Sequence, residues 1–103
     1  MFDKDKYITR GINTNIKMEI QLLIWSYIAE LSKRKNFKLD YLQVFELSPY
    51  SEDAGTHNEK IIHRQEVGSY EETHLIKIDE PFTAKIYVID DGKYSTMMLA
   101  EEY

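Results

Sequence analysis

The amino-acid sequence predicts an α+β fold, in which one N-terminal amphipathic helix packs on a mostly antiparallel sheet of five to six strands. Two observations lead to this prediction. Apolar residues recur at helical spacing in residues 16–34, and short segments rich in β-branched and aromatic residues alternate with turns after residue 40. Glycines and prolines lie between these segments, where turns are expected. Residues 1–103 show neither a repeat nor a linker, so we expect a single domain.

A short strand and the helix come first. Residues 6–9 are β-branched and aromatic, which is typical of a strand. The Asn13-Thr14-Asn15 run offers N-cap side chains for a helix that begins at Ile16, and Asn36 is a plausible C-terminal stop. The predicted apolar face of this helix consists of Ile16, Ile20, Leu23, Ile24, Tyr27, Ile28 and Leu31.

Five further strands are expected after the helix. They cover residues 41–47, 59–67, 72–78, 82–90 and 94–100, with a long polar loop over residues 48–58. Short connections between successive strands favour antiparallel pairing, since parallel neighbours need a longer crossover.

Two turns predict a register. A two-residue turn at Asp91-Gly92 would pair Ile86 with Met97, Ala84 with Leu99 and Val88 with Ser95. Phe82, Ala84, Ile86 and Val88 would then share a core-facing side with Met97 and Leu99. A turn at Gly68-Ser69 would make His63 and His74 direct cross-strand partners, with Ile61 opposite Ile76 and Gln65 opposite Glu72.

Composition excludes several classes. Cysteine is absent, so there is no disulfide framework and no thiolate nucleophile. The net charge of -5 makes a nucleic-acid partner unlikely, because such binding draws on basic groups. No segment has the apolar length of a membrane span, and the charged N-terminus does not read as a signal peptide, so we expect a cytoplasmic protein.

The predicted histidine pair is the best candidate for chemistry. Two imidazoles that lie close together can bind a metal or a small ligand, or switch with pH, and Glu72 is the obvious third contact. The competing interpretation is a hydrogen-bonded pair at the rim of the core, because no recognised ligand spacing such as HExxH is present. No cofactor is therefore expected.

Motifs of catalysis are missing. The sequence has no P-loop, no GxGxxG and no GxSxG elbow, so an enzyme is the less favoured interpretation. The basic residues Lys33, Arg34, Lys35 and Lys38 suit the negative end of a helix dipole better than a phosphate-binding patch.

Aromatic residues favour an interaction surface. Tyrosine is enriched where proteins meet, and the chain has eight. The candidates are Tyr70, Tyr87 and Tyr94, together with Trp25, which falls off the apolar helix face and could serve either a second core or an interface. The leading hypothesis is a non-catalytic module that binds a protein partner, or itself, through a tyrosine-bearing sheet face or an exposed strand edge.

Three stretches resemble a family of small uncharacterised bacterial proteins, a domain of unknown function. They are residues 6–12 (KYITRGI), residues 41–47 followed by 63–67 (YLQVFEL and HRQEV), and the ending over residues 88–92 and 95–103. The resemblance covers nearly the whole chain and implies a stand-alone cytoplasmic protein. It implies no activity, cofactor or catalytic residue.

Overall fold

The computed structural model describes residues 1–53 and 55–103. It contains the strands β1 (Lys6–Ile8), β2 (Leu42–Pro49), β3 (Glu59–Gln65), β4 (Glu71–Ile76), β5 (Ala84–Asp90) and β6 (Ser95–Leu99). The helices are α1 (Arg10–Asn15) and α2 (Met18–Ser32), and a short 3-10 turn, η1 (Ala100–Glu102), follows β6. Among the described residues no helix is long and apolar enough to cross a membrane.

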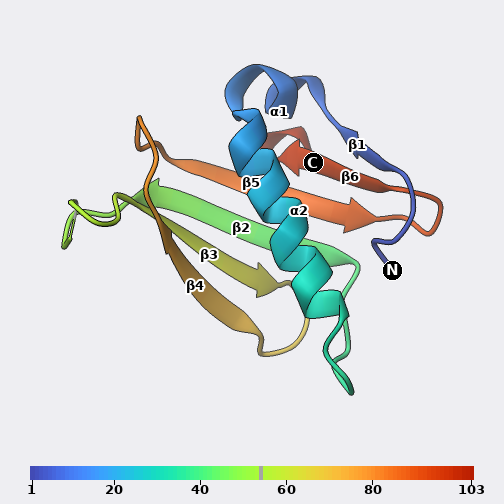
Figure 1. Ribbon diagram of the computed structural model, residues 1–103. Coiled ribbons are helices and arrows are strands. Elements are labelled where there is room, and N and C mark those ends of the chain that lie inside the picture. Colours follow the sequence, from blue (N-terminus) through green and yellow to red (C-terminus); the bar gives the residue numbers. More distant parts are fainter. Residues whose placement is uncertain (54) are drawn as a thin grey trace.

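The strands form one six-stranded sheet in the order β1-β6-β5-β2-β3-β4. The α+β class is as predicted, but the expectation of a mostly antiparallel sheet is corrected: the sheet is mixed, because β1 pairs in parallel with β6. The long excursion through α1, α2 and four strands that separates β1 from β6 permits this parallel pairing. In Figure 1, β1 lies beside β6 at the edge of the sheet, and α2 crosses one face.

The helical region also differs from the prediction. Two helices replace the single one expected over residues 16–34, because Ile16 and Lys17 are extended between them. Thr9 caps α1 by accepting from the backbone N–H of Ile12, so the predicted cap residues 13–15 lie inside α1. The break is held by the buried Gln21, whose side-chain amide donates to the Ile16 carbonyl at 2.8 Å.

The helix α2 is only partly amphipathic. Its sheet-facing side buries Ile20, Ile24, Ile28 and Leu31 as the spacing indicated. On the outer side Met18 and Leu22 are 63% and 60% exposed, so apolar residues are not confined to one face. The prediction of a clearly amphipathic helix is corrected accordingly. The core that α2 closes over includes Phe45, Leu47, Ile61, Ile86, Val88 and Met97.

Both predicted registers are shifted by two residues. In the β5–β6 hairpin Ile86 lies opposite Leu99 and Val88 opposite Met97, because the turn is centred on Gly92 and Lys93 rather than on Asp91 and Gly92. The Asp91 carboxylate accepts from the Lys93 and Tyr94 amides at 2.9 and 3.0 Å, which sets that turn. Since the shift is an even number, the core-facing side of each strand is unchanged.

The strands β4 and β5 follow one another in the chain but are not neighbours in the sheet. The short connection between these strands predicts that they pair with each other, but β5 pairs with β2 instead. Three strand spacings, about 14 Å, separate β4 from β5, and a seven-residue connection can span that distance. The predicted loop over residues 48–58 is shorter, because β2 extends to Pro49; residue 54 lies outside the described residues.

Candidate functional site

His63 lies on β3, next to the edge strand β4, on the side of the sheet that faces α2. It is fully buried on β3. Its ring stacks on Phe45 with a centroid distance of 4.2 Å and meets the edge of Tyr70 at 5.2 Å. The sheet places it there because alternate residues of β3, Ile61 among them, point into the core.

The hydrogen bonds of Gln43 determine which tautomer neutral His63 adopts. The Gln43 side-chain N–H₂ donates to the Asp40 carbonyl and to the Gln65 side-chain oxygen, both at 2.9 Å. Its oxygen is therefore an acceptor, and His63 Nε2 must donate to it across 2.7 Å. Neutral His63 then keeps a bare Nδ1, which has no partner among the described residues.

Burial keeps His63 neutral. Loss of hydration lowers the pKa of His63 from 6.5 to about 4, with His74 and Arg34 acting in the same direction and Glu72 opposing them. A buried, neutral, hydrogen-bonded histidine is a core residue that stabilises one packing arrangement.

His74 lies on the same face but is not the direct partner of His63. The structure pairs His74 with Ile61 and His63 with Glu72, which corrects the predicted pairing by two positions. His74 stacks on Tyr27 of α2 with a centroid distance of 3.8 Å and an interplanar angle of 7°. Its buried Nε2 has no hydrogen-bond partner among the described residues. Burial lowers the pKa of His74, and Glu72 opposes that shift.

Glu72 is held by two neighbours. Its Oε2 accepts from the Tyr70 hydroxyl at 2.8 Å and from Arg34 Nη2 at 3.2 Å. The hydrogen bond from Tyr70 is the largest influence lowering the pKa of Glu72. Burial and the same carboxylate raise the pKa of Tyr70 to about 12, so its hydroxyl remains a donor.

The three predicted ligand residues do not form a metal centre. His63, His74 and Glu72 share a face of the sheet, but one nitrogen of His63 is committed to Gln43 and Glu72 to Tyr70 and Arg34. Within residues 1–53 and 55–103 no cluster of three or more histidine, cysteine or acidic side chains is placed to hold a metal ion.

A hollow of about 340 Å³ adjoins His74 and Glu72. Its walls come from the last turns of α2 and from β4, and the lining residues are Tyr27, Glu30, Leu31, Arg34, Tyr70, Glu72 and His74. The sequence analysis assigned Tyr27 to the core and Arg34 to a helix end. The spacing of residues 27, 30, 31 and 34 is the signal that places them on one helical side.

The basic residues at the end of α2 are partly neutralised. Arg34 pairs with Glu72, and Lys33 lies 3.6 Å from the Glu30 carboxylate. Lys33 caps α2 and Arg34 follows it, which agrees with the helix-end interpretation.

The predicted interface aromatics fall in different places. Tyr70 lines the hollow, whereas Trp25 packs against the core with the Lys6 ammonium 5.7 Å from its ring. Tyr94 meets Tyr7 edge to face at 5.0 Å. Tyr87 meets Tyr103 in the same way at 5.4 Å.

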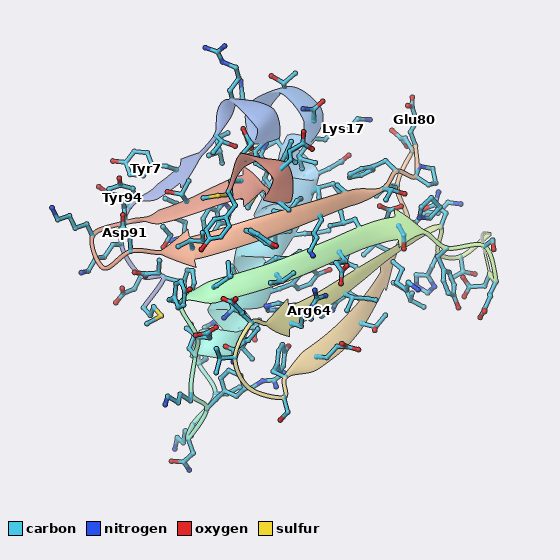
Figure 2. All side chains as sticks on the ribbon, turned by 180° about the vertical axis from the view of Figure 1, so that it is seen from behind. Tyr7, Lys17, Arg64, Glu80, Asp91 and Tyr94 are labelled. Carbon is cyan, nitrogen blue, oxygen red and sulfur yellow. The ribbon has the colours of Figure 1, made fainter. Side chains whose placement is uncertain are left out.

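The sheet face opposite α2 carries an apolar centre. We call it the open face, and Figure 2 shows it from behind with no helix across it. Leu42 lies opposite Ile89, and Tyr87 lies between Val44 and Met98. Ile62 extends this group on β3. Lys85 and Thr96 also lie on this side, so polar side chains border the apolar centre.

Charged residues border this centre. Arg64, labelled in Figure 2, forms an ion pair with Glu46 on the neighbouring strand. Lys60 and Lys85 lie on the same face, and neither ammonium has an ion-pair partner among the described residues. The open face thus carries two cations without a salt bridge among the described residues, on a chain whose net charge is -5, and the Lys85 ammonium lies 5.8 Å from the centroid of the Tyr87 ring.

These features define a small α+β domain with one sheet face packed on a helix and the other without a helix across it. Residues 5–102 match the family described as a staphylococcal protein of unknown function (DUF960), and the chain belongs to that family. This match confirms the resemblance to a bacterial domain of unknown function.

A solved structure has the same fold. The crystal structure of a protein of unknown function from Enterococcus faecalis superposes with a TM-score of 0.76 at 21% sequence identity. The match covers 98% of this chain and 92% of the other. No curated protein matches this sequence.

Proposed function

We propose that this domain is a non-catalytic protein-binding module that docks its partner on the open face. The observation that carries the proposal is the apolar centre of that face. A sheet covered on one side only normally alternates apolar residues inside with polar residues outside. Here β2 places Leu42 and Val44 on the open side, and these two side chains are only 3% and 4% exposed.

The residues that a partner would touch surround this pair. Ile62, Tyr87, Ile89 and Met98 are partly exposed around Val44 and Leu42, and Tyr103 is 70% exposed beside Tyr87. Tyrosine rings at the centre of an interface, where a partner removes them from water, are typical of binding hot spots. A continuous apolar centre of this kind supports an interaction surface.

Charge favours an acidic partner surface. Lys60 and Lys85 border the apolar centre without an ion pair among the described residues, whereas Arg64 is neutralised by Glu46. Carboxylates on the partner would therefore speed association and fix orientation, with a dependence on salt. A second copy of this acidic chain is one such partner.

A concentration series by size-exclusion chromatography with light scattering tests self-association first. If the wild type dimerises, Met98→Glu should weaken the dimer, because it places a charge opposite Tyr87. Leu22→Glu is the matched control, since Leu22 lies on the outer side of α2 and is already 60% exposed. Thermal melts establish that both variants fold.

If the wild type stays monomeric, affinity capture with the same three proteins follows. A captured protein is then purified, and its binding to each variant is measured at two salt concentrations. The proposal predicts loss with Met98→Glu, retention with Leu22→Glu and weaker binding at high salt. A strict monomer with no partner sensitive to Met98→Glu would exclude it, as would a preference of this face for single-stranded RNA.

A cytoplasmic location is part of this proposal. Cell fractionation of the tagged full chain tests it, and recovery outside the cytoplasmic fraction would contradict it.

A further inference from the structure

The hollow between α2 and β4 contains an ion pair that uses only part of its bonding capacity. Among the described residues, the ion pair between Arg34 and Glu72 has one hydrogen bond, from Nη2 at 3.2 Å. The hydrogen bonds that Arg34 and Tyr70 donate to Glu72 both end on Oε2. Guanidinium has five N–H donors and a carboxylate has two oxygens. The hollow thus offers further donors on Arg34 beside a second acceptor oxygen on Glu72.

Both members of the pair are accessible. The side chains of Arg34 and Glu72 are 50% and 43% exposed. Glu30 also lines the hollow, but its carboxylate lies 3.6 Å from the Lys33 ammonium, which balances its charge. The remaining charged groups of the lining are the Arg34 cation and the Glu72 anion, which lie side by side.

The rest of the lining is apolar or aromatic. Leu31 is buried, and the rings of Tyr27 and His74 stack on each other. The Nε2 of His74 has no partner among the described residues. A volume of about 340 Å³ lies at the lower end of the range of small-molecule sites.

Charge balance selects among ligand classes. A simple anion that bonds to Arg34 would meet repulsion from Glu72, and a simple cation that bonds to Glu72 would meet repulsion from Arg34. A ligand that carries both charges a few bonds apart satisfies both groups without breaking their mutual contact. An apolar substituent on that ligand would lie against Leu31 and Tyr27.

We propose that this hollow binds a zwitterion of the α-amino-acid class. The ligand carboxylate accepts from the remaining N–H groups of Arg34, and its ammonium donates to Oε1 of Glu72. Its apolar side chain packs on Leu31 and the Tyr27 ring. This site is separate from the open face and does not depend on the proposed protein-binding function.

Three matched probes test the charge requirement: L-phenylalanine, 3-phenylpropionate, which lacks the ammonium, and 2-phenylethylamine, which lacks the carboxylate. Each is titrated at millimolar concentrations into the full ¹⁵N-labelled chain near neutral pH. We expect L-phenylalanine to shift the backbone amides around Arg34 and Glu72. Each single-charge probe should bind at least about ten-fold more weakly, because one charge-assisted hydrogen bond is lost.

Variants test the two residues. Arg34→Gln and Glu72→Gln should each weaken L-phenylalanine binding about ten-fold or more. Lys35→Gln, which removes a neighbouring cation that does not line the hollow, should leave binding unchanged. Met98→Glu should also have no effect, which separates this site from the open face.

Three results would overturn the proposal. They are the absence of shifts with L-phenylalanine, equal binding of either single-charge probe, and unchanged binding in both Arg34→Gln and Glu72→Gln. Thermal melts of each variant ensure that a loss of binding is not a loss of folding.

Discussion

Replacing His63 with glutamine should remove a pH dependence of stability that this one residue creates. His63 is buried between Phe45 and Tyr70, and burial lowers its pKa from 6.5 to about 4 in the folded state. Between these two values the unfolded chain binds a proton that the folded chain does not. Stability from this group is therefore complete above about pH 6.5, falls as the pH drops, and is fully lost below about pH 4.

The size of the effect follows from the shift. One pKa unit corresponds to about 1.4 kcal/mol, so the shift of His63 corresponds to about 3 kcal/mol of unfolding free energy. Glutamine does not titrate, and its side-chain amide can still donate toward Gln43. The difference in stability between wild type and His63→Gln should therefore change by about 3 kcal/mol from neutral pH to about pH 4.

Urea unfolding followed by far-UV circular dichroism measures this difference at a series of pH values. Comparing two proteins cancels groups that both retain, such as the buried Glu59, whose pKa is raised by burial and whose contribution has the opposite sign. His57→Gln is the control, since His57 lies in the β2–β3 loop beside Asp53. A wild-type minus His63→Gln difference that stays constant with pH would refute the reasoning.

The remaining predictions concern packing, backbone and a terminal contact. Ile24→Ala should lower the free energy of unfolding in urea by about 2–4 kcal/mol, because Ile24 is fully buried. Leu22→Ala, on the outer side of α2, should lower it by less than about 0.5 kcal/mol. Similar losses in the two variants would mean that the outer side is also packed. Gly92→Ala should lower the free energy of unfolding by about 1 kcal/mol, because Gly92 has a φ of 97°. Gly55→Ala should be nearly neutral, because a Cβ added there meets no atom within 4 Å. Equal effects of the two variants in thermal melts would contradict the turn geometry. Glu102→Gln should lower the melting temperature and speed hydrogen exchange of the Gly11 amide. The reason is that the Glu102 carboxylate accepts from the Thr9 hydroxyl at 2.6 Å and from the Gly11 N–H at 3.1 Å. Unchanged exchange at Gly11 would show that this contact does not hold α1.

Local spacing predicted the sides of the elements well. Ile20, Ile24, Ile28 and Leu31 recur at helical intervals and are buried, and Ile86, Val88 and Met97 alternate with outward residues and are buried. These results are robust because a register error of two residues leaves every side chain on its own face. The same error moved His74 away from His63 and brought Glu72 opposite His63.

The sequence indicated only some of the residues of the candidate site. His74 and Glu72 were singled out, but the hollow also needs Tyr27 and Arg34 from the end of α2. No local pattern indicates that this helix end lies over β4, because the contact joins residues about 40 positions apart. The break between α1 and α2 is similar: it depends on the capping bond from Gln21 to Ile16.

The sequence alone determined the α+β class, the buried side of α2 and the core-facing sides of the strands, because these follow from side-chain periodicity within each segment. Only the tertiary structure decided that β5 pairs with β2 and that β1 lies parallel to β6. A strand presents the same kind of backbone donors and acceptors to any neighbour, so its own residues do not select the partner. That selection comes from how α2 and all six strands bury their apolar sides together, and it fixes both the open face and the hollow beside His74.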